Sequence, residues 1–196
     1  MIRRLPLARH FAVLTMLICT SAANAAPALY SVDAAKSMLE FAFVQAGAQN
    51  KGRFPKLAVN FNFDADNLAG AHLDVTIDLS ALDTGDKERD DTLRDADLFS
   101  VARFPQAHFT AAQISKTAAG GYEAAGTFLL RGVTRALRVP FTLRSATEQG
   151  RPVLYMTGKT LIKRLDFGVG QGDWKSTEWV GNDVNITFTL RLLVAS

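Results

Sequence analysis

The sequence contains very few of the residues on which most catalytic and metal sites depend. Among its 196 residues there are only three histidines and one cysteine, Cys19. It has no Gly-x-Ser-x-Gly nucleophile motif, no phosphate-binding loop and no His-x-x-x-His pair. Because Cys19 lies in a segment that we expect to be removed, disulfides, thiol catalysis and zinc bound by cysteine are excluded for the remaining chain. We therefore expect no metal, no cofactor and no catalytic residue.

A long apolar run that could span a bilayer stably is also lacking. The apolar stretch Phe11–Cys19 is short, and it follows three arginines within the first nine residues. The small-x-small tripeptide Ala23-Asn24-Ala25 then fits a cleavage site. We interpret residues 1–25 as a signal peptide removed after Ala25, which leaves residues 26–196 as a single secreted domain.

Excess charge of either sign is missing once this segment is gone. The whole chain has 22 basic and 19 acidic side chains. Removing the three arginines of the expected signal peptide leaves 19 basic residues, which match the 19 acidic ones. A balanced chain has no general attraction to nucleic acid or to anionic membranes. We therefore expect no nucleic-acid partner.

Period-two alternation of apolar and polar residues is abundant instead, and it predicts antiparallel strands with one face inward. The clearest alternation covers residues 59–63, 73–79, 137–143 and 184–192. Weaker strands are expected near residues 38–45, 106–115, 121–131 and 152–163. Pairs such as Gly120-Gly121 and Gln149-Gly150 fit the turns between them. The pattern predicts an all-β fold of about eight antiparallel strands.

Such a sheet must close or stack to protect its edges, and eight strands suit a barrel that is either filled or holds one slim ligand. Long strands favour an extended barrel. The inward faces carry mainly Phe, Leu, Val and Ile, so an open lumen would be apolar. A solid β-sandwich core made of the same residues remains the alternative.

Residues 82–109 interrupt the strands with a charge-dense segment. We expect a short helix near residues 84–98 that connects two strands at one end of the barrel. Asp83 or Thr84 fits its N-cap, and Asp90 can pair with Arg94 four residues later. The interleaved basic residues and the absence of calcium-loop spacing argue against a metal site. Its apolar underside would rest on the barrel through Leu93, Leu98 and Phe99.

Short motifs recur through the rest of the chain in a fixed order. They are Phe41-x-Phe43-x-Gln45-x-Gly47, Gly52-x-Phe54, Leu82-Asp83-Thr84-Gly85, Arg89-Asp90-x-x-Leu93-Arg94, Leu98-Phe99, Phe104-Pro105-x-x-x-Phe109, Gly126-x-Phe128-x-Leu130-x-Gly132-Val133-Thr134 and Arg164-x-Asp166-Phe167-Gly168. As an ordered set they resemble the YceI-like family. The resemblance implies an extended lipocalin-like barrel that binds a polyisoprenoid lipid in its lumen, usually in the periplasm. The chain has Gln45 and Thr92 at two positions where the family often has His.

The alternation and the resemblance together give a set of candidate site residues. We expect the lipid chain to contact the inward side chains of Phe41, Phe43, Val59, Phe61, Phe63, Val75, Ile77, Phe109, Phe128, Val139, Phe141, Tyr155 and Phe188. Head-group contacts are expected from Gln45, Arg53, Lys163 and Arg164. Arg164 can alternatively form an ion pair with Asp166 at a glycine bend. Trp174 and Trp179 can either gate the opening or pack against the end of the barrel.

These observations favour a periplasmic binding protein that holds a polyprenyl phosphate or an isoprenoid quinone, for sequestration or transport. We expect a monomer or a weak homodimer without a stable membrane span. One alternative is a secreted stress-response or structural protein that binds another protein or an envelope component. A less favoured alternative is an enzyme acting on a lipophilic substrate, whose residues would have to converge inside the barrel.

Overall fold

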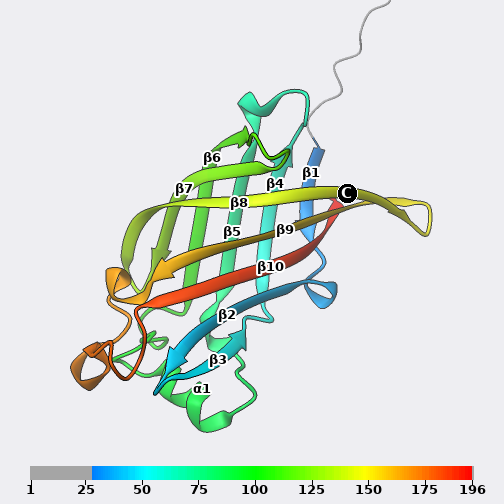
Figure 1. Cartoon of the computed structure of the whole chain (residues 1–196). Helices are drawn as coiled ribbons and strands as arrows, with labels where there is room; N and C mark the ends of the chain where they lie inside the picture. The colour runs from blue at the N-terminus through cyan, green and yellow to red at the C-terminus, as the bar shows by residue number, and fades with distance from the viewer. Residues whose placement is uncertain (1–27, 196) are drawn as a thin grey trace, which may run out of the picture.

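Alternating apolar and polar residues build ten β-strands in the computed structural model, which describes residues 28–195 (Figure 1). The expected signal peptide lies outside the described residues. The strands are β1 (Ala28–Val32), β2 (Met38–Gln45), β3 (Ala48–Arg53), β4 (Leu57–Phe63), β5 (His72–Asp78), β6 (Gln106–Lys116), β7 (Tyr122–Leu130), β8 (Val133–Glu148), β9 (Arg151–Lys163) and β10 (Asp183–Val194). The single α-helix of this part of the chain is α1 (Lys87–Arg94). Short 3₁₀ helices are η1 (Ala34–Lys36), η2 (Leu68–Gly70), η3 (Leu79–Ala81), η4 (Arg164–Phe167) and η5 (Gly172–Lys175).

The ten strands occupy eight positions in a closed antiparallel ring. The strands β4 to β10 pair in chain order, and β1 pairs with both β4 and β10. The strand β2 also pairs with β10, and β3 pairs with β2. Thus β1 and β2 follow one another along one position, while β3 and β4 share the next. The expected eight-stranded lipocalin-like barrel is confirmed.

Three hairpins turn within two residues, at 46–47, 131–132 and 149–150. Both residues of each turn have positive φ, as at Gln149 (50°) and Gly150 (76°). Such turns match the right-handed twist of the flanking strands, and glycine at the second position adopts this backbone without strain. The Gln149-Gly150 turn was therefore readable from the sequence, as was the wider turn that contains Gly120 and Gly121 between β6 and β7.

One half of the barrel interior is solid. Four rings from three strands form a closed circuit, which we call the aromatic plug: Phe61, Phe63, Tyr122 and Phe141. Their centroids lie 4.9 Å (Phe61–Phe63), 5.2 Å (Phe63–Tyr122), 5.5 Å (Tyr122–Phe141) and 6.1 Å (Phe61–Phe141) apart. These are ordinary distances for stacked and edge-to-face pairs. Phe61 is completely buried. The end of the barrel that contains this plug is its closed end.

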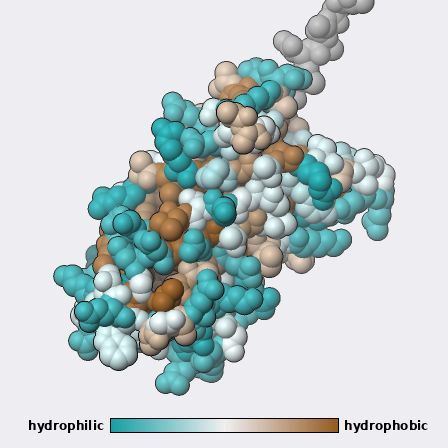
Figure 2. Space-filling view, in the orientation of Figure 1, coloured by the Kyte–Doolittle hydropathy of each residue, from teal (hydrophilic) through white to brown (hydrophobic). Residues whose placement is uncertain are grey.

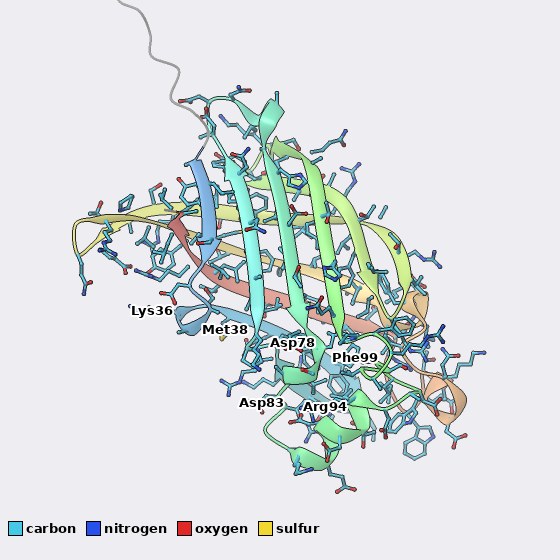
Figure 3. All side chains as sticks on the ribbon, turned by 180° about the vertical axis from the view of Figure 1, so that it is seen from behind. Lys36, Met38, Asp78, Asp83, Arg94 and Phe99 are labelled. Atoms are coloured by element: carbon cyan, nitrogen blue, oxygen red, sulfur yellow. The ribbon has the colours of Figure 1, made fainter. Side chains whose placement is uncertain are left out.

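The opposite end, the open end, is bounded by α1, the β2–β3 hairpin and the segment 164–182. Figure 3 shows Asp78 at the end of β5, with Asp83, Arg94 and Phe99 gathered near it at this end of the barrel. A second apolar cluster occupies this half and includes Leu98, while Leu93 and Phe99 pack against it. The expected apolar underside of the charged segment is confirmed.

The helix is shorter than expected, and its polar contacts differ. The N-cap is Asp86, whose carboxylate accepts a hydrogen bond from the Arg89 backbone N–H at 3.1 Å. Asp90 accepts bonds from the backbone N–H and the hydroxyl of Thr84, at 2.8 and 2.7 Å. The expected Asp90–Arg94 pair is wrong. The Arg94 guanidinium instead donates to the backbone carbonyl of Leu82 at 2.7 Å and pairs with the Asp91 carboxylate at 3.2 Å. Asp90 is thereby buried without an ion pair, and it fixes the loop before α1.

A charged cluster around the buried Arg191, on the outward side of the sheet, ties the β8–β9 hairpin to the break between β1 and β2. Arg191 donates to Asp33 at 2.6 Å and to Glu148 at 2.8 Å. The hydroxyl of Tyr155 donates to the other carboxylate oxygen of Glu148. Together these bonds hold the pKa of Glu148 below its ordinary value, the Tyr155 bond being the larger cause and the Arg191 bond the next. The same Glu148 contact raises the pKa of Arg191.

This lowered pKa predicts an acid-dependent loss of stability. Because the folded protein favours ionised Glu148, the stabilisation is fully present above the glutamate pKa of the unfolded chain, about 4.3. It is lost as the pH falls through the lower folded value. We expect Glu148→Gln to be less stable than the parent protein at neutral pH, with the difference shrinking as the pH falls below the unfolded glutamate pKa and vanishing only below the lower folded pKa. Urea unfolding at a series of pH values measures this. The control is Glu123→Gln, since Glu123 pairs with an exposed arginine, Arg138, and a gap between variant and parent that persists at low pH would contradict the assignment.

The outer surface is mostly polar, as expected of the alternate residues along each strand. Figure 2 shows polar side chains over most of one face, with apolar ones grouped toward its middle and lower part. The large apolar residues that remain exposed are Leu29, Met38, Val44, Leu161, Trp179 and Val194. Within residues 28–195, no helix combines the length and the apolar character that crossing a bilayer requires.

Candidate functional site

The half of the barrel next to the open end is hollow. It contains a cavity of about 590 Å³ whose walls are formed mainly by aliphatic and aromatic side chains. This size is typical of small-molecule sites. The expected alternatives of a filled core and an open lumen are therefore both present, one in each half of the barrel. The wall residues include Leu39, Phe41, Phe43, Val75, Ile77, Phe109, Phe128, Leu137, Ile162, Val184, Ile186 and Phe188.

The cavity ends blindly toward the aromatic plug. Met156 lines the cavity and also belongs to the buried cluster that contains the plug, and only 1% of its surface is exposed. Phe61 and Phe141 lie in the same cluster but do not line the cavity. The interior is thus hollow up to Met156 and filled beyond it. Its floor is formed by Leu73, Phe109, Val139, Met156 and Leu190, which line the cavity and belong to that cluster.

Polar residues line the cavity mainly at its mouth. Gln45 and Asn50 come from the β2–β3 hairpin, and Asp86, Glu88 and Arg89 come from the start of α1. Trp174 and Val180 from the segment after β9 lie on the opposite side. The mouth therefore opens between the hairpin, the helix and this segment.

The cation at the mouth is already paired within the protein. Arg89 donates to the Asn50 side-chain oxygen at 2.7 Å and to Asp86 at 3.3 Å. The backbone N–H and the guanidinium of Arg89 hold the pKa of Asp86 below its ordinary value, so Asp86 is ionised at neutral pH. Glu88 is exposed beside them. An anionic ligand would therefore meet carboxylates here and would have to compete for Arg89.

Arg164, the other cation of the cavity lining, organises the segment that borders the mouth. Its guanidinium donates to the carbonyls of Gly181 (3.0 Å), Val169 (2.9 Å), Val180 (2.7 Å) and Ser176 (3.3 Å). Only 4% of the residue is exposed, and burial lowers the pKa of its guanidinium. The expected Arg164–Asp166 ion pair is not formed among the described residues. Arg164 instead donates to backbone carbonyls near the start and near the end of the segment 164–182 and so holds these two parts together.

Removing this guanidinium is expected to loosen the segment. Arg164→Met leaves four carbonyls without their donor, which should lower the free energy of unfolding by about 2–3 kcal/mol. Amide hydrogen exchange should accelerate across residues 169–181. Lys163→Met is the matched control. Lys163 precedes Arg164 and its side chain is exposed, so this substitution should change the free energy of unfolding by less than about 0.5 kcal/mol. Unchanged exchange in Arg164→Met would refute this role.

Two aromatic wall residues are positioned by glycines on the neighbouring strand. Phe188 faces Gly158 across the β9–β10 pair, and Phe41 faces Gly52 across the β2–β3 pair. A Cβ atom at Gly158 would lie 2.4 Å from Cζ of Phe188, and one at Gly52 would lie 2.4 Å from Cζ of Phe41. Each ring therefore lies over its glycine, where any other residue would displace it.

The structure brings many of the expected site residues to the cavity. Of the expected head-group residues, Gln45 and Arg164 line it. The expected lipid-contact residues that line it are Phe41, Phe43, Val75, Ile77, Phe109, Phe128, Val139 and Phe188.

Other expected site residues lie elsewhere, each for a physical reason. Four of the expected lipid contacts belong to the buried cluster that fills the closed end, and they do not line the cavity. They are Val59, Phe61, Phe63 and Phe141. Tyr155 lies on the outer face, because its neighbours Leu154 and Met156 point inward and side chains alternate along a strand. A shift by one residue in which positions of β9 are taken to face inward is enough to place Tyr155 in the lumen by mistake.

The two remaining head-group candidates also lie outside the cavity lining. Arg53 donates to Asp83 at 2.7 Å, in an exposed ion pair beside the open end. Lys163 is exposed at the end of β9. The lining residues near the mouth that the sequence did not indicate are Asn50, Asp86, Glu88 and Arg89, whereas Trp174 was expected either to gate the opening or to pack against the end of the barrel, and Thr92 is one of the two departures from the family pattern. The charge-dense segment 82–109 and the family motif Arg89-Asp90-x-x-Leu93-Arg94 pointed to this helix, but not to its place at the mouth.

The walls carry few groups able to perform acid–base chemistry. The ionisable residues of the lining are Asp86, Glu88, Arg89 and Arg164, and the first three belong to the mouth. Among residues 28–195, no group of three His, Asp or Glu side chains is placed to hold a metal ion. The arrangement suits binding of an apolar chain in the cavity and contact with a polar group at the mouth.

A closed eight-stranded barrel with a deep apolar cavity and a polar mouth defines an extended lipocalin-like protein. The comparison with known families agrees. The model of the YceI-like domain matches residues 30–192, and the chain therefore belongs to the YceI-like family.

Sequence relatives and solved structures agree with this family assignment. A UPF0312 protein of Yersinia enterocolitica is 35% identical over 134 residues. The aligned region covers 66% of this chain and 67% of the relative. The crystal structure of BcnA from Burkholderia cenocepacia is 31% identical, with a TM-score of 0.76, and the match covers 82% of this chain and 98% of that one. A polyisoprenoid binding domain from Saccharophagus degradans, implicated in plant cell wall breakdown, has a TM-score of 0.65 at 21% identity, covering 85% and 98% of the two chains. The last likeness concerns the fold alone.

Proposed function

We propose that this protein binds a polyisoprenoid lipid, with the isoprenoid chain in the cavity and the head group at the mouth. The observation that carries the proposal is the cavity of about 590 Å³ with mainly apolar walls and polar residues mainly at one end. A linear amphiphile with a long apolar tail matches this distribution. Burial of the tail contributes roughly 0.8 kcal/mol per CH₂ group, so several isoprene units give tight binding without a charged anchor. Ordering of the chain offsets part of that gain.

The mouth favours an uncharged head group, such as an isoprenoid quinone, over a polyprenyl phosphate. Arg89 is held by Asn50 and Asp86, and Glu88 adds a second carboxylate. A phosphate would displace an existing ion pair and meet two negative charges, which disfavours its binding. A quinone carbonyl needs only a neutral donor, and the amide of Gln45 is available on the lining for that contact.

The proposed site of action is the periplasm, where the protein would sequester or carry the lipid as a monomer or weak homodimer. The support is the N-terminal pattern of basic residues, short apolar run and Ala23-Asn24-Ala25. The mass of the protein recovered from the periplasmic fraction should correspond to a chain that begins at Ala26. Recovery of the uncleaved chain from the cytoplasm would oppose this proposal.

Native mass spectrometry of the purified protein, followed by organic extraction, tests the ligand. We expect a co-purifying species whose fragments identify an isoprenoid chain, or uptake of an added isoprenoid quinone by the empty protein. Heat-denatured protein is the control for non-specific carry-over. The absence of a bound lipid together with no uptake of any prenyl compound would reject the proposal.

A further inference from the structure

The blind end of the cavity limits how far a ligand chain can extend into the barrel. The cavity stops at Met156, and behind it Phe61 and Phe141 meet edge-to-face with centroids 6.1 Å apart. All three residues are at most 3% exposed. A packed interior of this kind yields only at considerable cost. A chain that enters at the mouth therefore cannot pass through to the closed end.

We infer that the floor formed by Leu73, Phe109, Val139, Met156 and Leu190, with the aromatic plug behind it, selects isoprenoid ligands by tail length. This inference rests on the proposed function. Each isoprene unit that fits between mouth and floor is withdrawn from water and adds to the affinity. A unit beyond that limit stays outside the mouth and adds little. Binding therefore increases with tail length up to a fixed number of units and then levels off.

The cavity volume gives the expected limit. An apolar protein cavity of about 150 Å³ holds one benzene molecule, or about 25 Å³ for each non-hydrogen atom. At that packing, about 590 Å³ accommodates roughly 24 carbon atoms, which is about four to five isoprene units. The expected ligands are short polyprenyl chains, or longer ones whose distal part remains outside the barrel.

The test is a competition assay with linear all-trans prenols that differ by one isoprene unit, each displacing the uncharged fluorescent probe N-phenyl-1-naphthylamine. In the parent protein, each added unit should strengthen binding by at least about tenfold up to the limit and by less than about twofold beyond it. A series of straight-chain alcohols should level off at the same extended length, which tests the limit without any substitution.

Two opposite substitutions should move the limit. Met156→Ala removes part of the floor and should lengthen the limit by about one isoprene unit. Val139→Phe places a ring in space that is empty, so the fold should tolerate it, and it should shorten the limit by about one unit. Thr157→Ala, an exposed position next to Met156 on the outer face of β9, should leave the limit in place and serves as the control.

The outcomes separate this inference from the proposed function. If prenols bind but the affinity rises through the whole series, or if the limit is identical in the parent, Met156→Ala and Val139→Phe, selection by the floor is overturned while lipid binding stands. If no prenol of any length displaces the probe, the proposed function fails and this inference fails with it. A limit that moves in opposite directions in the two variants supports it.

Discussion

Replacing Ile186 by aspartate should abolish uptake of an isoprenoid chain while leaving the barrel folded. Ile186 lies in the first half of β10, lines the cavity, and faces Phe41 on β2 and Thr160 on β9. A carboxylate at this position can be hydrated by water in the empty cavity, so the fold tolerates it. An apolar chain that displaced this water would leave the charge unsolvated, which should weaken binding at least about a hundredfold, or roughly 3 kcal/mol. Displacement of the fluorescent probe measures this loss.

The matched control for this prediction is Thr187→Asp, one residue further along β10. Thr187 is exposed, and its cross-strand neighbours are Glu40 and Lys159. Because successive side chains of a strand point to opposite faces, the same charge is placed in water here and should change affinity by less than about twofold. Similar losses in the two variants would show that the apolar chain does not occupy the cavity.

Truncation of Phe61 to alanine should cause the largest loss of stability among the changes considered. Phe61 is completely buried and its ring contacts those of Tyr30, Phe63 and Phe141. The variant leaves a void in a filled region that cannot collapse around it, and the expected cost is about 3–5 kcal/mol of the free energy of unfolding. Equilibrium unfolding in urea, followed by circular dichroism, measures the change.

Phe188→Ala is the companion variant, since it removes the same side chain from the hollow half. Phe188 borders the cavity and is only half-buried, so fewer packing contacts are lost. Its expected cost is about 1–2 kcal/mol. If the two alanine variants lost the same stability, the division of the interior into a filled half and a hollow half would be wrong.

Most of the fold could be predicted because alternation reports directly on which side chains face inward. The weak alternation at residues 38–45 and the strong alternation at 184–192 both correspond to strands. The strand β3 could not be found in this way, because in Ala48–Arg53 only Gly52 is buried. It forms because the tight turn at Ala46-Gly47 brings it onto β2. Pairing with a neighbour, and not its own pattern, creates this strand.

The site was less predictable, since alternation cannot tell whether an inward side chain meets another side chain or empty space. Phe41 and Phe61 have the same local pattern, yet one lines the cavity and the other closes it. The difference arises because Tyr122 and Phe141, from strands distant in the sequence, reach the level of Phe61 through the register of the sheet. Apart from Gln45, the polar side chains of the mouth were missed for a related reason. Its residues come from a hairpin and a helix that meet only in the folded barrel, as the Asn50–Arg89 bond shows.

The closure of the ring has a consequence for how the barrel is made. The seam between β1 and β10 pairs Tyr30 with Val194, and the adjacent Asp33–Arg191 bond joins residues 158 positions apart. Contacts between such distant segments are slow to form, because a long stretch of chain must be ordered before they contribute. Until β10 is in place, the walls formed by β2 and β9 have no common neighbour and the hollow half is open along its side. The lumen is therefore enclosed only when the last strand of the chain has paired on both sides, so a truncation that removes β10 is expected to open the hollow half along its side.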